Sequence, residues 1–158
     1  MTGRHSSILC LVLLILLLTG CVAGPVVKQT PGQEAAALPV WEEHQQVLQT
    51  LDALIDAYQS RNSMAFSRYV SERYTGDDMI LDSRIRGDLR RAHDVGIRYT
   101  VNNITSDGRG KVFVAVTYTR EYTDIGTTQR VVHTGQAALI FIRDGGEYLL
   151  YSQPNPLF

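Results

Sequence analysis

The candidates for acid–base chemistry in this 158-residue chain are one histidine and two tyrosines in its second half. His133 lies near the middle of a segment with strand-like alternation, in register with Val131 and Gly135. A neutral imidazole in such a position can act as a general base, and Tyr118 or Tyr99 can donate a phenolic hydrogen bond to a developing oxyanion. The alternative is that His133 is a packed or half-exposed residue without a chemical role.

Carboxylates that could share this chemistry are scarce. From residue 97 to residue 143 the acids are Asp107, Glu121 and Asp124, and each lies at or beside a predicted turn. Aromatic residues are more plentiful, and they could line a site for a small apolar ligand or form an aromatic core. The ligand-binding candidates are Tyr58, Tyr99, Tyr118 and His133.

Motifs for metals, nucleotides and activated nucleophiles are absent from the sequence. It contains no H-x-x-x-H pair, no Asp-rich calcium loop, no Walker loop and no G-x-S-x-G elbow. Cysteine occurs only at Cys10 and Cys21, so the chain after residue 21 can form no disulfide or zinc knuckle. We therefore expect neither a metal site nor a cofactor.

Five arginines lie between Arg84 and Arg98, which suggests either an anion site or a solvated helix face. Charged residues spaced i, i+4 on a helix stabilise it by a few tenths of a kcal/mol per pair, which favours the solvated face. The pairs with this spacing are Asp82 with Arg86, Arg84 with Asp88, and Arg90 with Asp94.

The N-terminal residues resemble a bacterial lipoprotein signal peptide with its lipobox. Arg4 is followed by an apolar run, Ile8 to Leu18, and then by Thr19, Gly20 and Cys21. The resemblance implies cleavage after Gly20, lipidation of Cys21 and anchoring at a membrane by acyl chains. The alternative is an uncleaved signal anchor. Val22 follows Cys21, and the absence of an aspartate at this position resembles lipoproteins sorted to the periplasmic face of an outer membrane, in cells with two membranes.

Three segments follow from these boundaries: a signal peptide over 1–20, the lipidated cysteine with a flexible tether over 21–39, and one folded domain over 40–158. The tether is rich in proline and glycine and has no apolar periodicity. Residues 22–158 carry 14 basic and 16 acidic side chains, which gives 14 − 16 = −2. This near-neutral charge argues against a nucleic-acid partner.

Apolar periodicity predicts three helices at the start of the domain. The first spans about 20 residues from Val40. Ser63 is a plausible N-cap for a short second helix, Asp77 or Asp78 can cap the third, and Gly96 suits the position just past its end. The first helix is expected to bury a stripe formed by Trp41, His44, Val47, Leu48, Leu51, Leu54, Ile55 and Tyr58.

Alternation with a period of two then predicts four strands joined by hairpins. The first strand lies around 97–102, the second over 111–123, the third over 128–143 and the fourth over 148–153, before a tail at Pro154–Pro156. Gly135 suggests a bend or bulge in the third strand.

This order resembles the nuclear transport factor 2-like superfamily. Residues 51–66, LDALIDAYQSRNSMAF, look like the helix-turn-helix opening of SnoaL-like and ketosteroid-isomerase-like members, and the resemblance covers about 44–153. It implies an α+β fold in which three helices pack on a curved four-stranded antiparallel sheet, forming a cone that encloses a ligand pocket or a filled core. It also implies that the domain could form a homodimer through the open face of the sheet.

The function expected from these features is that of a lipid-anchored bacterial envelope protein. Its domain would be non-catalytic and would bind a small apolar ligand or dock an envelope protein. Isomerases of this fold need a carboxylate inside the cone, and no acid occupies a mid-strand position here. The alternative is an isomerase or dehydratase that uses His133 and a tyrosine. A solvent-open pocket containing His133 would favour the enzyme, and a cone filled by side chains would favour docking.

Overall fold

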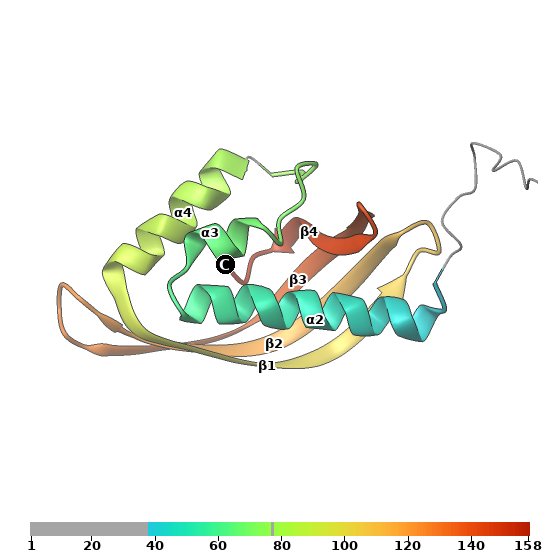
Figure 1. Ribbon diagram of the computed structural model, residues 1–158. Helices are drawn as coiled ribbons and strands as arrows, with labels where there is room; N and C mark the ends of the chain where they lie inside the picture. The colour runs from blue at the N-terminus through green and yellow to red at the C-terminus, as the bar shows by residue number, and fades with distance from the viewer. Residues whose placement is uncertain (1–37, 77) are drawn as a thin grey trace, which may run out of the picture. The chain divides into compact units, whose positions relative to one another are not determined.

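Three helices lie on one face of a four-stranded antiparallel sheet in the computed structural model, which describes residues 38–76 and 78–158 (Figure 1). The strands follow one another in the order β1-β2-β3-β4, so every connection is a hairpin. This arrangement confirms the predicted fold class. The predicted signal peptide, Cys21 and nearly all of the tether lie outside the described residues. Within the described residues, no helix is long and apolar enough to cross a membrane.

Helix α2, Val40–Gln59, confirms the predicted length of the first helix and most of its buried stripe but corrects the first turn. Val47, Leu51, Leu54 and Tyr58 are fully buried, as expected. Trp41 was expected in the buried stripe, but 61% of its surface is exposed, and Glu43 is buried instead. Two residues separate these positions by about 200° around a helix, so only one of them can face the core.

The buried Glu43 is stabilised by a hydrogen bond from a distant residue. Tyr148 Oη donates to Glu43 Oε1 at 2.9 Å, and both residues are buried. A buried polar group costs free energy unless it is hydrogen-bonded, so this contact is what permits a glutamate in the core stripe. It also couples the first turn of α2 to the last strand.

Helices α3, Ser63–Ser67, and α4, Asp78–Arg91, follow the predicted order with two corrections. Asn62, not Ser63, is the N-cap of α3, because its side-chain oxygen accepts from Ala65 N at 2.9 Å. Gly96 does not end α4. The helix passes directly into β1, and Gly96 pairs with Glu121 inside the sheet.

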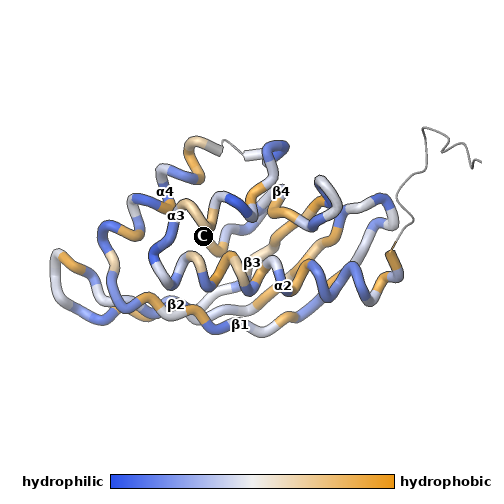
Figure 2. Tube along the Cα trace, viewed as in Figure 1, coloured by the Kyte–Doolittle hydropathy of each residue, from blue (hydrophilic) through white to orange (hydrophobic). Residues whose placement is uncertain are grey.

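The four strands are β1, Ala92–Ser106; β2, Lys111–Asp124; β3, Arg130–Asp144; and β4, Glu147–Asn155. β1 is much longer than the alternation predicted. Apolar and hydrophilic residues alternate along α2 and the strands (Figure 2). Val112, Val114 and Val116 of β2 are buried on the face that α2 covers. The sequence therefore separates an inner, helix-facing surface of the sheet from an outer one.

The irregularities of the sheet lie in the pairing of β1 with β2 and of β3 with β4, and not at Gly135. Register shifts occur between His93 and Gly96 and between Val101 and Asn103, whereas the pairing of β2 with β3 continues without a shift. The predicted bulge at Gly135 is therefore wrong. Gly135 lies opposite Tyr118, and a Cβ there would be 3.1 Å from Tyr118 Oη. The glycine makes room for the tyrosine ring.

Candidate functional site

The space between the helices and the inner face of the sheet contains a cluster of three aromatic rings. The Phe158 ring lies 5.5 Å from the Tyr58 ring and 4.9 Å from the Phe66 ring, measured between centroids. Tyr58 comes from α2 and Phe66 from α3, and the end of the chain lies beside these helices in Figure 1. All three side chains are buried. The chain's own residues thus occupy the middle of the cone.

The segment after β4 is held in place by hydrogen bonds to a side chain of β4. Gln153 Oε1 accepts from Leu157 N at 3.1 Å and from Phe158 N at 3.2 Å. Leu157 and Phe158 are each 3% exposed, so this segment contributes two core residues to the domain. The sequence predicted only a proline-containing tail here.

A polar cluster lies next to the aromatic rings. Asp88 Oδ2 accepts from Tyr58 Oη at 3.1 Å and from Arg120 Nη2 at 3.3 Å. The Arg120 guanidinium lies 5.0 Å from the Tyr58 ring centroid and 5.2 Å from that of Tyr122, in the range of cation–π contacts. Among the described residues, Arg120 Nε has no hydrogen-bond partner and is buried. The cluster joins α2, α4 and β2.

The phenols of this region act as hydrogen-bond donors to carboxylates. Burial is the main cause that raises the pKa of Tyr58 above its ordinary value. Burial is also the main cause that raises the pKa of Tyr99. The second cause is the hydrogen bond that Tyr99 Oη donates to Asp52 Oδ1 of α2 at 2.5 Å. Both hydroxyls therefore stay protonated near neutral pH, and both are already engaged within the domain.

The structure does not gather the predicted ligand-binding residues around one cavity. Tyr58 lies in the core, Tyr99 reaches α2, and Tyr118 lies across Gly135. His133 is exposed, and its ring stacks on that of Tyr122 with 6.2 Å between centroids. Arg120 and Asp88 are the residues that the sequence missed. The one usable signal for Arg120 was its alternation with Tyr118 and Tyr122 on the inner face of β2.

Two surface cavities lie away from these residues. One, of about 330 Å³, lies between α2 and the turn from β3 to β4, and the other, of about 230 Å³, lies between α3 and α4. Neither is lined by Tyr99, Tyr118 or His133. Within the described residues there is no group of three or more histidine, cysteine or acidic side chains able to hold a metal.

The helix charges are also arranged differently from the i, i+4 expectation. Asp82 and Arg86 form the predicted ion pair at 2.9 Å. Asp88 instead pairs with Arg120, and Asp94 lies beyond the helix in β1, where it contacts His93 at 2.7 Å. Asp88 therefore belongs to the inner cluster and not to a solvated helix face.

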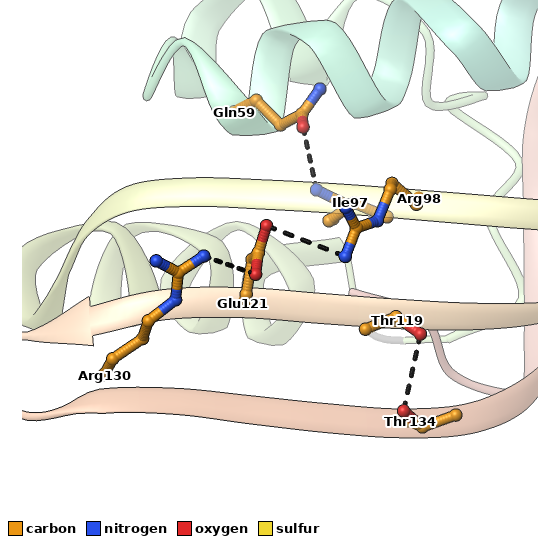
Figure 3. Close-up of polar contacts among 7 residues, drawn as sticks. All are labelled: Gln59, Ile97, Arg98, Thr119, Glu121, Arg130 and Thr134. Carbon is orange, nitrogen blue, oxygen red and sulfur yellow. Dashed lines mark hydrogen bonds and ion pairs between the residues drawn. The ribbon is translucent and has the colours of Figure 1, made fainter.

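The outer face of the sheet has a charged end and an uncharged middle. At the charged end, Glu121 pairs with Arg130 at 2.6 Å and with Arg98 at 3.9 Å (Figure 3). The hydrogen bond from Arg130 lowers the pKa of Glu121. In the middle, residues without charge face one another across β2 and β3, and we call them the outer-face patch. Its pairs are Phe113 with Ile140, Ala115 with Ala138, Thr117 with Gln136, and Thr119 with Thr134.

No family model and no curated protein matches this sequence. Solved structures match its fold at low identity. A ketosteroid isomerase-like protein from Erwinia carotovora atroseptica has a TM-score of 0.61 at 12% identity, covering 73% of this chain and 98% of that one. A protein of the nuclear transport factor 2-like family from Streptomyces avermitilis, provisionally assigned as a dehydratase, has a TM-score of 0.61 at 11% identity over 71% and 93%.

A third structure carries no activity in its description. It is a conserved protein from Planctomyces limnophilus, with a TM-score of 0.64 at 12% identity, covering 72% of this chain and 94% of that one. Three helices followed by a curved antiparallel sheet are common to this chain and its structural neighbours. This chain has the nuclear transport factor 2-like fold.

Proposed function

We propose that this chain is a bacterial envelope lipoprotein whose domain is non-catalytic and works by docking, with a second copy of itself as the partner. The filled cone is the observation that supports a non-catalytic domain. Tyr58, Phe66 and Phe158 occupy the space in which a ligand would have to bind. A docking protein needs a surface but no interior pocket.

The membrane anchor in this proposal rests on the sequence around Cys21. An apolar run, a small residue and a cysteine follow one another in the order of a lipobox. Two or three acyl chains on Cys21 would hold the chain at a bilayer, since each buried methylene contributes about 0.8 kcal/mol. The location is the cell envelope, and the outer membrane in cells that have one.

The outer-face patch supports a second copy as the partner. A two-fold axis brings the same surface of each copy together, so a charged face would repel itself. The patch contains no charged side chain, and Phe113, in the pair at one end of the patch, is 42% exposed. At the end of the patch, Glu121 is already neutralised by Arg130. Within the outer-face patch itself, like-charge repulsion therefore does not oppose self-association.

The enzyme alternative has less support from the geometry. It requires His133 and a tyrosine in a shared pocket, whereas His133 is exposed and neither of the two surface cavities described above is lined by His133 or Tyr118. The names of the isomerase-like and dehydratase-like neighbours describe those proteins, and several chemistries share this fold.

The docking proposal is tested by sedimentation of the detergent-solubilised chain. We expect two copies per particle for the wild type and one for Phe113→Asp, which puts like charges opposite each other at the interface. Met64→Asp is the matched control, because Met64 on α3 is 73% exposed and lies outside the patch. A single copy in the wild type, or two copies in a folded Phe113→Asp variant, would contradict self-docking.

A further inference from the structure

The first turn of α2 exposes two apolar side chains. Val40 is 59% exposed and Trp41 is 61% exposed. Trp41 is the single tryptophan of the chain. Trp41 lies outside the outer-face patch and is not part of the buried core. Exposure of two apolar side chains does not by itself mark an interaction site, so what Val40 and Trp41 contact has to follow from their position.

The exposure of Trp41 is fixed by contacts on the other side of the helix. Leu38 packs against the core just before the helix begins, and Pro39 O accepts from the backbone N–H groups of Glu42 and Glu43. The buried Glu43 accepts from Tyr148 Oη at 2.9 Å. Rotating the helix to bury Trp41 would expel Glu43 and break this hydrogen bond. The indole is therefore held outward.

The position of Trp41 in the sequence indicates what the indole meets. Trp41 follows Cys21 by 41 − 21 = 20 residues. A segment of that length spans at most about 70 Å when extended, and about 25 Å as a flexible coil. If Cys21 is acylated, the first turn of α2 stays within at most about 70 Å of the bilayer. Such tethering makes even a weak contact with the bilayer frequent.

We propose that Val40 and Trp41 contact the headgroup region of the phospholipid bilayer and orient the domain on the membrane. Tryptophan concentrates at membrane–water interfaces because its ring is apolar while its N–H still needs a hydrogen-bond partner. The charge of −2 on residues 22–158, from 14 − 16, provides no overall attraction to anionic lipid. The contact therefore requires neither anionic lipid nor low salt. This inference rests on the lipid anchor of the proposed function.

The experiment uses the single tryptophan as its own reporter. The acylated full chain is reconstituted into phosphatidylcholine vesicles, with and without bromine on the upper part of the lipid acyl chains. We expect Trp41 emission to shift to shorter wavelength relative to Cys21→Ser lacking residues 1–20, and to be quenched by the brominated lipid. The matched control is Trp41→Tyr with Gln49→Trp, which moves the reporter about two turns along α2 to another exposed position. Its emission should not be quenched.

Vesicle flotation separates failure of this inference from failure of the anchor. If the full chain floats with the vesicles but bromine leaves Trp41 emission unchanged, the contact is overturned and the anchor stands. Equal quenching of Trp41 and of Gln49→Trp also overturns the contact, because it would mean unspecific adsorption. If the full chain does not float, both the anchor and the contact are wrong.

Discussion

Replacing Phe158 by alanine tests whether the cone is filled by the chain itself. The Phe158 side chain is 3% exposed and contacts the rings of Tyr58 and Phe66. Phe→Ala in a core costs about 3–5 kcal/mol, including the loss of ring contacts and the cavity that remains. The segment after Asn155 belongs to no strand and can relax toward the cavity, so we expect a loss at the lower end, about 3 kcal/mol.

The assay is equilibrium urea unfolding of residues 22–158, with Met64→Ala as the control. Met64→Ala shortens a side chain that is 73% exposed and lies outside the outer-face patch, so it should cost no more than about 1 kcal/mol. Benzene should raise the melting temperature of Phe158→Ala and leave that of the wild type unchanged, because a dry apolar cavity binds small aromatic molecules. Equal losses for the two alanine variants would refute the filled cone.

Three further predictions concern single residues. Tyr148→Phe should lower the free energy of unfolding by about 1–3 kcal/mol, because it leaves the buried Glu43 carboxylate without its donor. Burial raises the pKa of Tyr148 from 10.0 to about 12, so this difference between wild type and variant should be full below pH 10 and shrink as the pH rises from 10 to 12. A difference that does not change with pH would contradict this assignment. Gly135→Val should cost about 1–3 kcal/mol by forcing Tyr118 aside, and the cost should largely vanish in a Tyr118→Ala background. If the cost is the same in both backgrounds, Tyr118 is not its cause. Metabolic labelling with a fatty acid should mark the wild type and not Cys21→Ser, and equal labelling would show that Cys21 is not the acylation site.

Local signals in the sequence predicted the order of elements correctly. The extent of α2 follows from helical periodicity that begins at Val40. The three hairpins follow from the switch to a period of two after residue 96 and from turn residues such as Gly145 and Gly146, whose φ angles of 59° and 96° favour glycine. These signals are local, so the sequence carries them in full. β1 was predicted too short because its bulges interrupt the alternation at Asp94 and Asn102.

Which residue the first turn of α2 buries depends on a contact that the sequence does not display. Hydrophobicity ranks tryptophan above glutamate for the buried stripe, yet Glu43 is buried because Tyr148, 105 residues later, donates to it. The same limitation applies to Asp88. Its i, i+4 neighbour Arg84 suggested a surface pair, and its partners proved to be Tyr58 and Arg120, which are 30 and 32 residues away.

The filled cone could also not be predicted from the sequence. Pro154 and Pro156 suggested a tail, but β4 continues to Asn155. Beyond it, hydrogen bonds to Gln153 Oε1 hold Leu157 and Phe158 in the core. Whether two apolar residues after a strand cover a core or remain in solvent depends on the space that other elements leave. The sequence therefore left both an open and a filled cone possible, and only the packing of Leu157 and Phe158 distinguishes them.

Native mass spectrometry of the full chain, expressed in a bacterium and released from its membranes in mild detergent, tests the central claim most directly. We expect a chain that begins at Cys21 and carries covalent acyl chains, in particles of two copies without a small molecule bound non-covalently. A stoichiometric small molecule retained by the folded chain would contradict the filled cone, and a chain that still carries residues 1–20 would contradict the lipid anchor.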